Sequence, residues 1–297
     1  MRTPSFAYKD EEARRVRRTG HELGVRHPVW SVNDKDDAHA WARRLGLRVP
    51  RLLGEHPDVT EVRWADLPDR AVLKPVKGAA SRGVLLLERT GDRWRDLHAG
   101  EVVTTEELTG RHRALADAGT ISREVIVEEL VQDPQRPGMP PVDWKVHCFF
   151  GHVGLVLAKS SRRRPEGPPA VGWRLFDDGW NDLGAAVGGH PVDEGIRPPV
   201  HAEELLRVAR LVSAAVPRAF LRVDLYDGAD GVVFGEITPE PGNRHLFRRD
   251  VDRRMGELWE EAEARLLLRC TAAGALEPAD GPLPESAVAL DLSTSRG

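Results

Sequence analysis

Apolar and polar positions repeat with two different periods along the chain. In FLRVDLYDGADGVVFGEIT, residues 220–238, two apolar runs carry acids at alternate positions and are joined by DGADG, which predicts a β-hairpin. In HAEELLRVARLVSAAV, residues 201–216, apolar residues recur at helical spacing, which predicts an amphipathic helix. The same patterns predict further strands at 48–56, 71–75, 82–89, 124–131 and 143–161, and further helices at 33–46, 103–119 and 253–270.

Capping residues define the start of two of these helices. Asn33 or Asp34 is the expected N-cap of the first, because a short polar side chain there accepts a hydrogen bond from a free backbone N–H. Thr104 or Thr105 precedes Glu107 in the pattern of a capping box, in which cap and acid satisfy each other's backbone groups. Both helices are therefore expected to begin at these residues.

Turn residues and loops separate the remaining elements. A tight turn at Gly151 and His152 is expected to divide 143–161 into two strands. Residues 161–172 are rich in Arg, Pro and Gly and are expected to form a loop. The end of the chain from Thr271, rich in Ala, Pro, Asp, Glu and Ser, is expected to be a loose tail.

Composition indicates a globular protein of one large domain or a few subdomains, because 297 residues with 40% hydrophobic content can bury a sizeable core. A net charge of -4 gives no electrostatic reason to expect nucleic acid or an anionic membrane as partner. Cys148 and Cys270 lack the spacing of a zinc or redox motif, so buried free thiols in a reducing cytosol are expected. With no long apolar run and a highly charged start, we expect a cytoplasmic protein that does not insert into a membrane. The oligomeric state is not indicated.

Lysine placement is the first sign of chemistry. Only six of the 43 basic residues are lysines, and Lys74, Lys77 and Lys145 lie in or beside apolar runs. A compact ammonium in such a place suits a phosphate group. For any one of these lysines alone, chance placement of a solvated charge is an equal explanation.

Two segments in the first half extend this hypothesis. In AVLKPVKGAASRGVLLLE a lysine at a strand end precedes a loop of small residues whose amides can approach an anion, although this is not a Walker A loop. An ordinary hairpin turn is the alternative. In EVIVEELV, Glu128 and Glu129 end a buried strand, so one of them points toward the core side and needs a ligand donor or a salt bridge as partner.

The hairpin at 220–238 carries the sharpest signal. Arg222 and Asp224 share one face of their strand, and Glu236 and Thr238 share one face of theirs. If these faces coincide, two carboxylates meet, and carboxylate oxygens together with substrate phosphates suit Mg²⁺. Arg222 beside them would stabilise a phosphate. An exposed hairpin with acids on its wet face is the alternative.

Taken in order, these motifs resemble the ATP-grasp ligases, and within them the TupA-like proteins of teichuronopeptide biosynthesis. The resemblance runs from about Val29 to Gly242 through LPDRAVLKP, GAASRG, IVEELV, DWKVHCFFG, FLRVDLYDG and VVFGEITPEPG. It implies an α+β fold in which two α+β subdomains grip a nucleotide, preceded by a small N-terminal helical or α/β region. The implied division is an N-terminal region at 1–68, a subdomain with the phosphate flap at 69–131, a subdomain with the Mg²⁺ site at 132–270 and a tail at 271–297.

The resemblance also implies roles for single residues, with ATP and Mg²⁺ as cofactors. The implied catalytic residues are Lys74, Lys145 and Arg222; the implied nucleotide contacts are Lys74, Gly78, Ser81 and Gly83 of a glycine-rich flap, the hinge residues Glu128, Glu129 and Val131, Asp133 at the ribose, and Lys145; the implied metal ligands are Asp224, Glu236 and Thr238. Many ATP-grasp ligases have Asn where this chain has Thr238. A neutral hydroxyl is a weaker ligand, which bears on whether one Mg²⁺ or two are held.

The expected function is an ATP-dependent carboxylate–amine ligase that forms an amide through an acyl phosphate. Its substrates would be a small-molecule or polymer carboxylate, such as a sugar acid or a peptide carboxylate, and an amine. The alternatives are an ATP-grasp kinase that phosphorylates a hydroxyl and a non-catalytic nucleotide-binding module. The basic segment SSRRRPEG is equally well explained as an acceptor-binding loop or a solvated one. His147 and His152 are expected to be structural.

Overall fold

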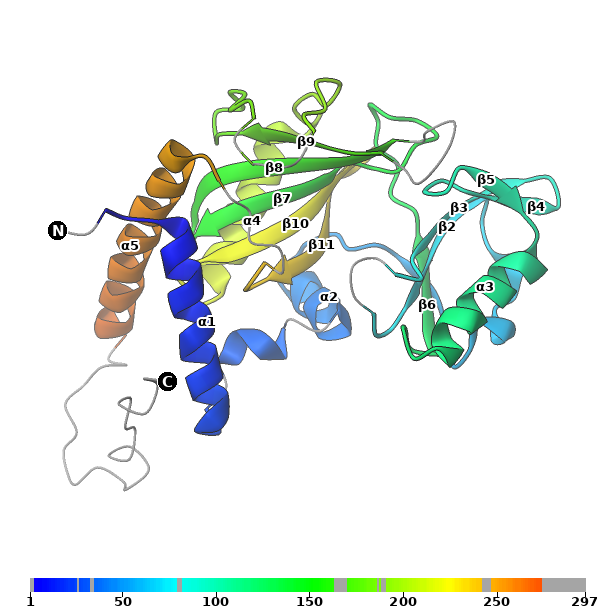
Figure 1. Ribbon diagram of the computed structural model, residues 1–297, viewed down its shortest axis with the longest axis horizontal. Helices are drawn as coiled ribbons and strands as arrows, with labels where there is room; N and C mark the ends of the chain where they lie inside the picture. Colours follow the sequence, from blue (N-terminus) through cyan, green and yellow to red (C-terminus); the bar gives the residue numbers. More distant parts are fainter. Residues whose placement is uncertain are drawn as a thin grey trace.

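The computed structural model describes residues 3–25, 27–32, 35–78, 82–162, 170–185, 187, 191–241 and 247–273. Four predicted features lie outside the described residues: the N-cap at Asn33 or Asp34, the flap tip at Ser81, most of the loop 161–172 and the tail from residue 274. Two antiparallel sheets organise the described chain, the first on the right of Figure 1 and the second in its centre. Helices accompany both, so the predicted α+β class is confirmed.

The first sheet has six strands in the order β1-β6-β2-β3-β4-β5. Its elements are β1 (Leu52–His56), β2 (Arg70–Pro75), β3 (Leu85–Thr90), β4 (Arg93–Asp96), β5 (Glu101–Val103), α3 (Thr105–Asp117) and β6 (Val125–Glu129). On one face, Leu73, Leu87 and Val127 join a core that includes Leu108 of α3. Thr104 caps α3 and forms the predicted capping box with Glu107. Because this core and α3 cover only one face of the sheet, the opposite face remains available for a site.

The second sheet has five strands in the order β11-β10-β7-β8-β9. Its strands are β7 (Asp143–Phe149), β8 (His152–Arg162), β9 (Ala170–Phe176), β10 (Leu221–Gly228) and β11 (Gly231–Thr238), and its helices are α1 (Phe6–Glu22), α2 (Lys35–Arg44), α4 (Ala202–Ala215) and α5 (Arg249–Ala272). The core on one face includes Ala42 of α2 and Val212 of α4. The core on the other face includes Phe6 of α1 and Trp259 of α5. Figure 1 shows α1 and α5 at the end of this sheet that lies away from the first sheet.

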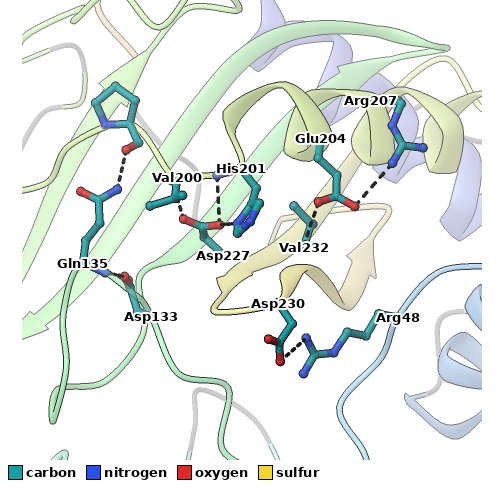
Figure 2. Close-up of polar contacts among 11 residues, drawn as sticks. Arg48, Asp133, Gln135, Val200, His201, Glu204, Arg207, Asp227, Asp230 and Val232 are labelled. Atoms are coloured by element: carbon teal, nitrogen blue, oxygen red, sulfur yellow. Dashed lines mark hydrogen bonds and ion pairs between the residues drawn. The ribbon is translucent and has the colours of Figure 1, made fainter.

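The segment between α2 and β1 runs from the second sheet to the first. The carbonyl of Arg48 accepts a hydrogen bond from the backbone N–H of Phe234 in β11 at 2.8 Å. Its guanidinium lies 3.4 Å from Glu129 at the end of β6. It also lies 3.7 Å from Asp230 in the β10–β11 turn, a contact that Figure 2 shows. This segment therefore connects the two sheets close to the predicted hinge.

Several elements differ from the prediction. The helix α1 and the strands β4, β5 and β9 were not expected, and β9 begins at Ala170, within the expected loop. The β7–β8 turn lies at Phe150 and Gly151, one residue earlier than predicted. Both residues have a positive φ (43° and 84°), as a type I′ turn requires. Both cysteines are free thiols, but only Cys148 is buried. In the described part of the chain, every helix is too short or too polar to span a membrane.

Candidate active site

Lys145 and Asp224 form the centre of the site on the second sheet. They are direct cross-strand partners between β7 and β10, so their side chains leave the sheet on the same face. The Lys145 Nζ lies 2.5 Å from Asp224 Oδ2 and 2.7 Å from Asp143 Oδ2. Burial alone would lower the pKa of Lys145, but the two carboxylates outweigh it and raise the pKa above its ordinary value. Lys145 is therefore a cation held in place from two sides.

Arg222 lies on the same face of β10 and completes the cluster. Its Nε and Nη2 donate to the two oxygens of Asp224 at 2.6 and 2.7 Å. The Nη2 also donates to Thr238 Oγ1 at 2.9 Å and lies 3.8 Å from Glu236 Oε1. Burial alone would lower the pKa of Arg222, but Asp224 outweighs burial and raises this pKa above its ordinary value. The hydroxyl of Thr238 thus already accepts a hydrogen bond from Arg222.

Asp224 and Glu236, the two predicted metal ligands, meet across the hairpin. They are cross-strand partners. The bulge at Gly235, the residue before Glu236 in β11, shifts the register so that the two acids pair. A Cβ at Gly235 would lie 3.0 Å from both the Asp224 carbonyl and the Tyr226 ring, which is why this bulge contains glycine. The coincidence of the two acidic faces, which the sequence left open, is therefore observed.

The two carboxylates differ in their electrostatic surroundings. Asp224 is almost fully buried, which would raise its pKa, but Arg222 and Lys145 lower it well below the usual range. The Glu236 side chain is 43% exposed, yet desolvation by the surrounding protein and the nearby Asp224 raise its pKa. The surroundings therefore disfavour the charged form of Glu236 and favour that of Asp224.

Lys74 and Glu128 lie on the open face of the first sheet. The Lys74 Nζ lies 2.5 Å from Glu128 Oε2, with 12% and 8% of the two side chains exposed. Val72 is the cross-strand partner of both Glu128 and Leu86, so an apolar surface continues from this ion pair. Leu86, Leu97 and Leu130 form a small cluster there. The arrangement places a cation at one end of an apolar surface.

The predicted hinge residues follow on the same strand and its continuation. Glu129 is held by Arg48 at 3.4 Å and Arg51 at 3.9 Å, and Val131 is buried. Asp133 accepts hydrogen bonds from the backbone N–H of Gln135 at 2.9 Å and of Val142 at 3.1 Å. Figure 2 shows the first of these. Burial raises the pKa of Asp133. Its carboxylate thus shapes the loop that leads to β7, and its predicted contact with ribose stays a prediction.

The flanks of the predicted flap fit tightly against Ile121 and Pro75. Gly83 has a φ of +74°, and a Cβ there would lie 2.8 Å from Ile121 Cδ1. A Cβ at Gly78 would lie 3.2 Å from the ring of Pro75. Glycine at these two positions therefore has a structural reason besides the predicted approach to a phosphate.

Two cavities help to place the site. The larger, about 670 Å³, lies between the β7–β8 turn and the start of α5, and no predicted site residue lines it. The smaller, about 400 Å³, is lined by Val76, Lys77 and Ile126 among others. Because Ile126 is the cross-strand partner of Lys74, the smaller cavity adjoins the predicted site. We therefore assign the chemistry to the charged cluster and not to the larger of these two cavities.

Sequence reasoning missed three residues of this region. Asp143 begins β7 and contacts Lys145, and its position two residues earlier on the same strand was an available signal. Tyr226 lies two residues beyond Asp224; burial raises its pKa, as do acids of both sheets, among them Glu128. His39 of α2 contacts both sheets, and no local pattern could have indicated this.

Comparison with protein families places the chain. The model of the TupA-like ATP-grasp family matches residues 14–260, so the chain belongs to this family and the predicted resemblance is confirmed. No curated protein matches the chain.

One solved ligase shares the fold at low sequence identity. The D-alanine–D-alanine ligase from Bacillus anthracis in complex with ATP is 15% identical, with 86% of this chain and 76% of that chain covered and a TM-score of 0.51. The ATP-grasp ligase PsnB complexed with a minimal precursor is 18% identical, with 80% and 61% covered and a TM-score of 0.44. This chain thus spans about three fifths of the length of PsnB. The predicted ATP-grasp fold is confirmed.

Proposed function

We propose that the protein is an ATP-dependent carboxylate–amine ligase. The observation that carries the proposal is the meeting of Asp224 and Glu236 beside Lys145 and Arg222 on one sheet, with Lys74 on the open face of the other. Membership of the ATP-grasp family supports this reading of the cluster. The acceptor that we propose is a sugar acid or a peptide carboxylate, and the second substrate is an amine.

The donor set fits Mg²⁺. Mg²⁺ prefers hard oxygen ligands and commonly takes one or two carboxylates together with phosphate oxygens and water. Asp224 and Glu236 supply two such carboxylates from adjacent strands, and the raised pKa of Glu236 marks a site where an added cation is favourable. The Thr238 hydroxyl is a third oxygen close by, although it accepts from Arg222. Asp224 and Glu236 would hold the ion, and Thr238 would be a weaker ligand.

The basic residues would hold and neutralise phosphate groups. When bound, MgATP supplies the phosphoryl group that turns a substrate carboxylate into an acyl phosphate, from which an amine then displaces phosphate to form an amide. Lys145 and Arg222 have raised pKa values, so both stay charged throughout the neutral pH range. Lys74 would contact phosphate from the opposite sheet. Catalysis of this kind needs positioning and charge neutralisation, with no side-chain nucleophile.

The histidines of the second sheet fit the expected structural role. His147 is buried, with its ring 5.9 Å from Phe220 and 5.9 Å from Phe247. His152 lies at the β7–β8 turn, beside the larger cavity. We therefore assign neither of them to proton transfer.

Hydroxylamine trapping tests the proposed function. The protein is incubated with MgATP, hydroxylamine and a panel of sugar acids and peptide carboxylates, and hydroxamate and ADP are measured together. A ligase should form hydroxamate in step with ADP for at least one carboxylate, whereas a kinase would give a stable phosphorylated product with no hydroxamate. Lys74→Met should abolish product formation. Lys9→Met, which changes a lysine paired with Glu263 on the surface helices, is the matched control and should keep it.

A further inference from the structure

One side chain joins the two halves of the site. His39 lies in α2, whose Ala38 and Ala42 pack in the core of the second sheet. From there its ring reaches the first sheet, where Nδ1 lies 3.6 Å from Glu128 Oε1. Only 9% of the His39 side chain is exposed. One ring nitrogen therefore faces each sheet.

The partner on the second sheet is a backbone carbonyl beside a predicted metal ligand. His39 Nε2 lies 2.9 Å from the carbonyl oxygen of Gly235, and because a carbonyl can only accept, Nε2 carries the proton. β11 is the edge strand of its sheet, so groups on its outer side have no further strand to bond. The next residue, Glu236, pairs with Asp224. The histidine therefore fixes the backbone at the bulge that orients Glu236.

The partner on the first sheet is the carboxylate that holds Lys74. Glu128 Oε2 lies 2.5 Å from the Lys74 Nζ, and Oε1 faces His39. Burial lowers the pKa of His39, with the charges of Lys74 and Arg43 acting in the same direction and Glu128 acting against them. The lowered pKa favours the uncharged ring. With its proton on Nε2, such a ring has none on Nδ1 to donate, so the 3.6 Å approach to Glu128 Oε1 is a packing contact and not a hydrogen bond.

We propose that His39 is a positioning residue that sets the spacing between the phosphate-binding Lys74 on the first sheet and the metal-binding Glu236 on the second. The proposal rests on the proposed function, since it assumes that both sheets hold one MgATP. A continuous series of contacts supports it, from Lys74 through Glu128 and His39 to the Gly235 carbonyl.

The structure also suggests what loss of His39 would do. Without the ring, the outer side of the bulge loses a hydrogen bond and Glu236 is less firmly oriented toward Asp224. The benefit that Mg²⁺ brings to ATP binding should therefore fall, while contacts of the nucleotide with the first sheet persist. Substitutions of residues that orient metal ligands typically reduce metal affinity or activity by about 10- to 100-fold. A substitution that only lowers stability would leave the benefit of Mg²⁺ unchanged.

The test measures ATP binding by equilibrium dialysis well below the melting temperature, with Mg²⁺ and with EDTA, for wild type, His39→Ala and His39→Gln. The amide nitrogen of Gln can take the place of Nε2 and donate to Gly235. The matched control is His112→Ala in α3, another buried histidine whose ring nitrogens have no hydrogen-bond partner among the described residues. We expect the affinity gain from Mg²⁺ to fall about tenfold or more in His39→Ala and to stay close to wild type in His39→Gln and in the control.

Each outcome decides between distinct claims. If Mg²⁺ improves ATP affinity in His39→Ala as much as in wild type, the positioning role is overturned. The same holds if His39→Gln loses as much of this improvement as His39→Ala does. If His39→Ala does not fold, the His39→Gln variant alone still decides, because loss of its gain would contradict the role of the Nε2 donor. No ATP binding by the wild type would instead overturn the proposed function.

Discussion

Replacing Asp224 by Asn should destabilise the protein strongly even without any ligand. The carboxylate is 3% exposed and accepts three charged hydrogen bonds, from Lys145 at 2.5 Å and from Arg222 at 2.6 and 2.7 Å. An amide offers one acceptor oxygen and no charge, so two buried cations would lose their main counter-ion. Removing one partner of a buried ion pair typically costs about 3–5 kcal/mol, which corresponds to a fall in melting temperature of roughly 10 °C for a chain of this size.

Asp250→Asn is the matched control for this prediction. Asp250 also receives two hydrogen bonds from one arginine, Arg248, at 2.7 and 2.9 Å, but it lies on the surface at the start of α5. Arg248 lowers its pKa to about 2. Because water screens an exposed ion pair, this variant should have the melting temperature of the wild type. The comparison separates the effect of burial from the effect of ion-pair geometry.

The pH dependence of stability in wild type and Asp224→Asn gives a second check. The folded-state pKa of Asp224 lies below its unfolded value of about 3.9, so its stabilisation is present above that pH and is lost as pH falls toward the folded pKa. Urea unfolding should show the full difference between wild type and Asp224→Asn at pH 6 to 7 and a smaller one below about pH 4. Equal stability of the two proteins at pH 7 would refute the account of a buried, charge-compensated carboxylate.

Three further substitutions test other parts of the structure. Lys74→Met should cost about 3 kcal/mol in urea unfolding because Glu128 loses its buried partner; adding Glu128→Gln should recover most of this loss without restoring ATP binding, and no recovery would argue against the ion pair as the cause. Glu236→Gln should melt at or above the wild-type temperature in the absence of ligand, because its charge is disfavoured by burial and by Asp224; a clear drop in calorimetry would contradict this. Thr104→Ala should cost about 1 kcal/mol through loss of the α3 cap, and Thr104→Ser should recover it; equal urea midpoints of wild type and Thr104→Ala would show that the cap adds nothing.

The second sheet was predictable mainly because its site is built from neighbouring strands. Once the hairpin at 220–238 is assigned, alternation alone places Arg222 and Asp224 on one face. The face of β11 that it meets could not be predicted in this way, because the bulge at Gly235 shifts the register by one residue and so brings Glu236 opposite Asp224. The strand β9 was missed because its first residues continue a segment rich in proline, glycine and arginine. The short strands β4 and β5 have too few residues to show a period.

Features that depend on distant parts of the chain were not predictable in this way. The buried residues of helix α1 are Phe6 and Asp10, so few buried apolar side chains mark this segment as a helix in the sequence. His39 and the carbonyl it contacts are 196 residues apart, and nothing in the sequence around either one indicates the other. Local patterns thus pointed to the residues of the charged cluster, whereas the contacts between the two sheets required the folded structure.

Binding of ATP in the presence and absence of Mg²⁺ tests the central claim most directly. Melting temperatures are measured for wild type and Glu236→Gln with ATP, with Mg²⁺ and with both. A ligand at 100 times its Kd stabilises the folded state by about 2.7 kcal/mol. The wild-type melting temperature should therefore rise more with ATP and Mg²⁺ together than with either alone, and this additional rise should shrink in Glu236→Gln. An unchanged wild-type melting temperature at saturating MgATP, or an equal rise in both proteins, would contradict it.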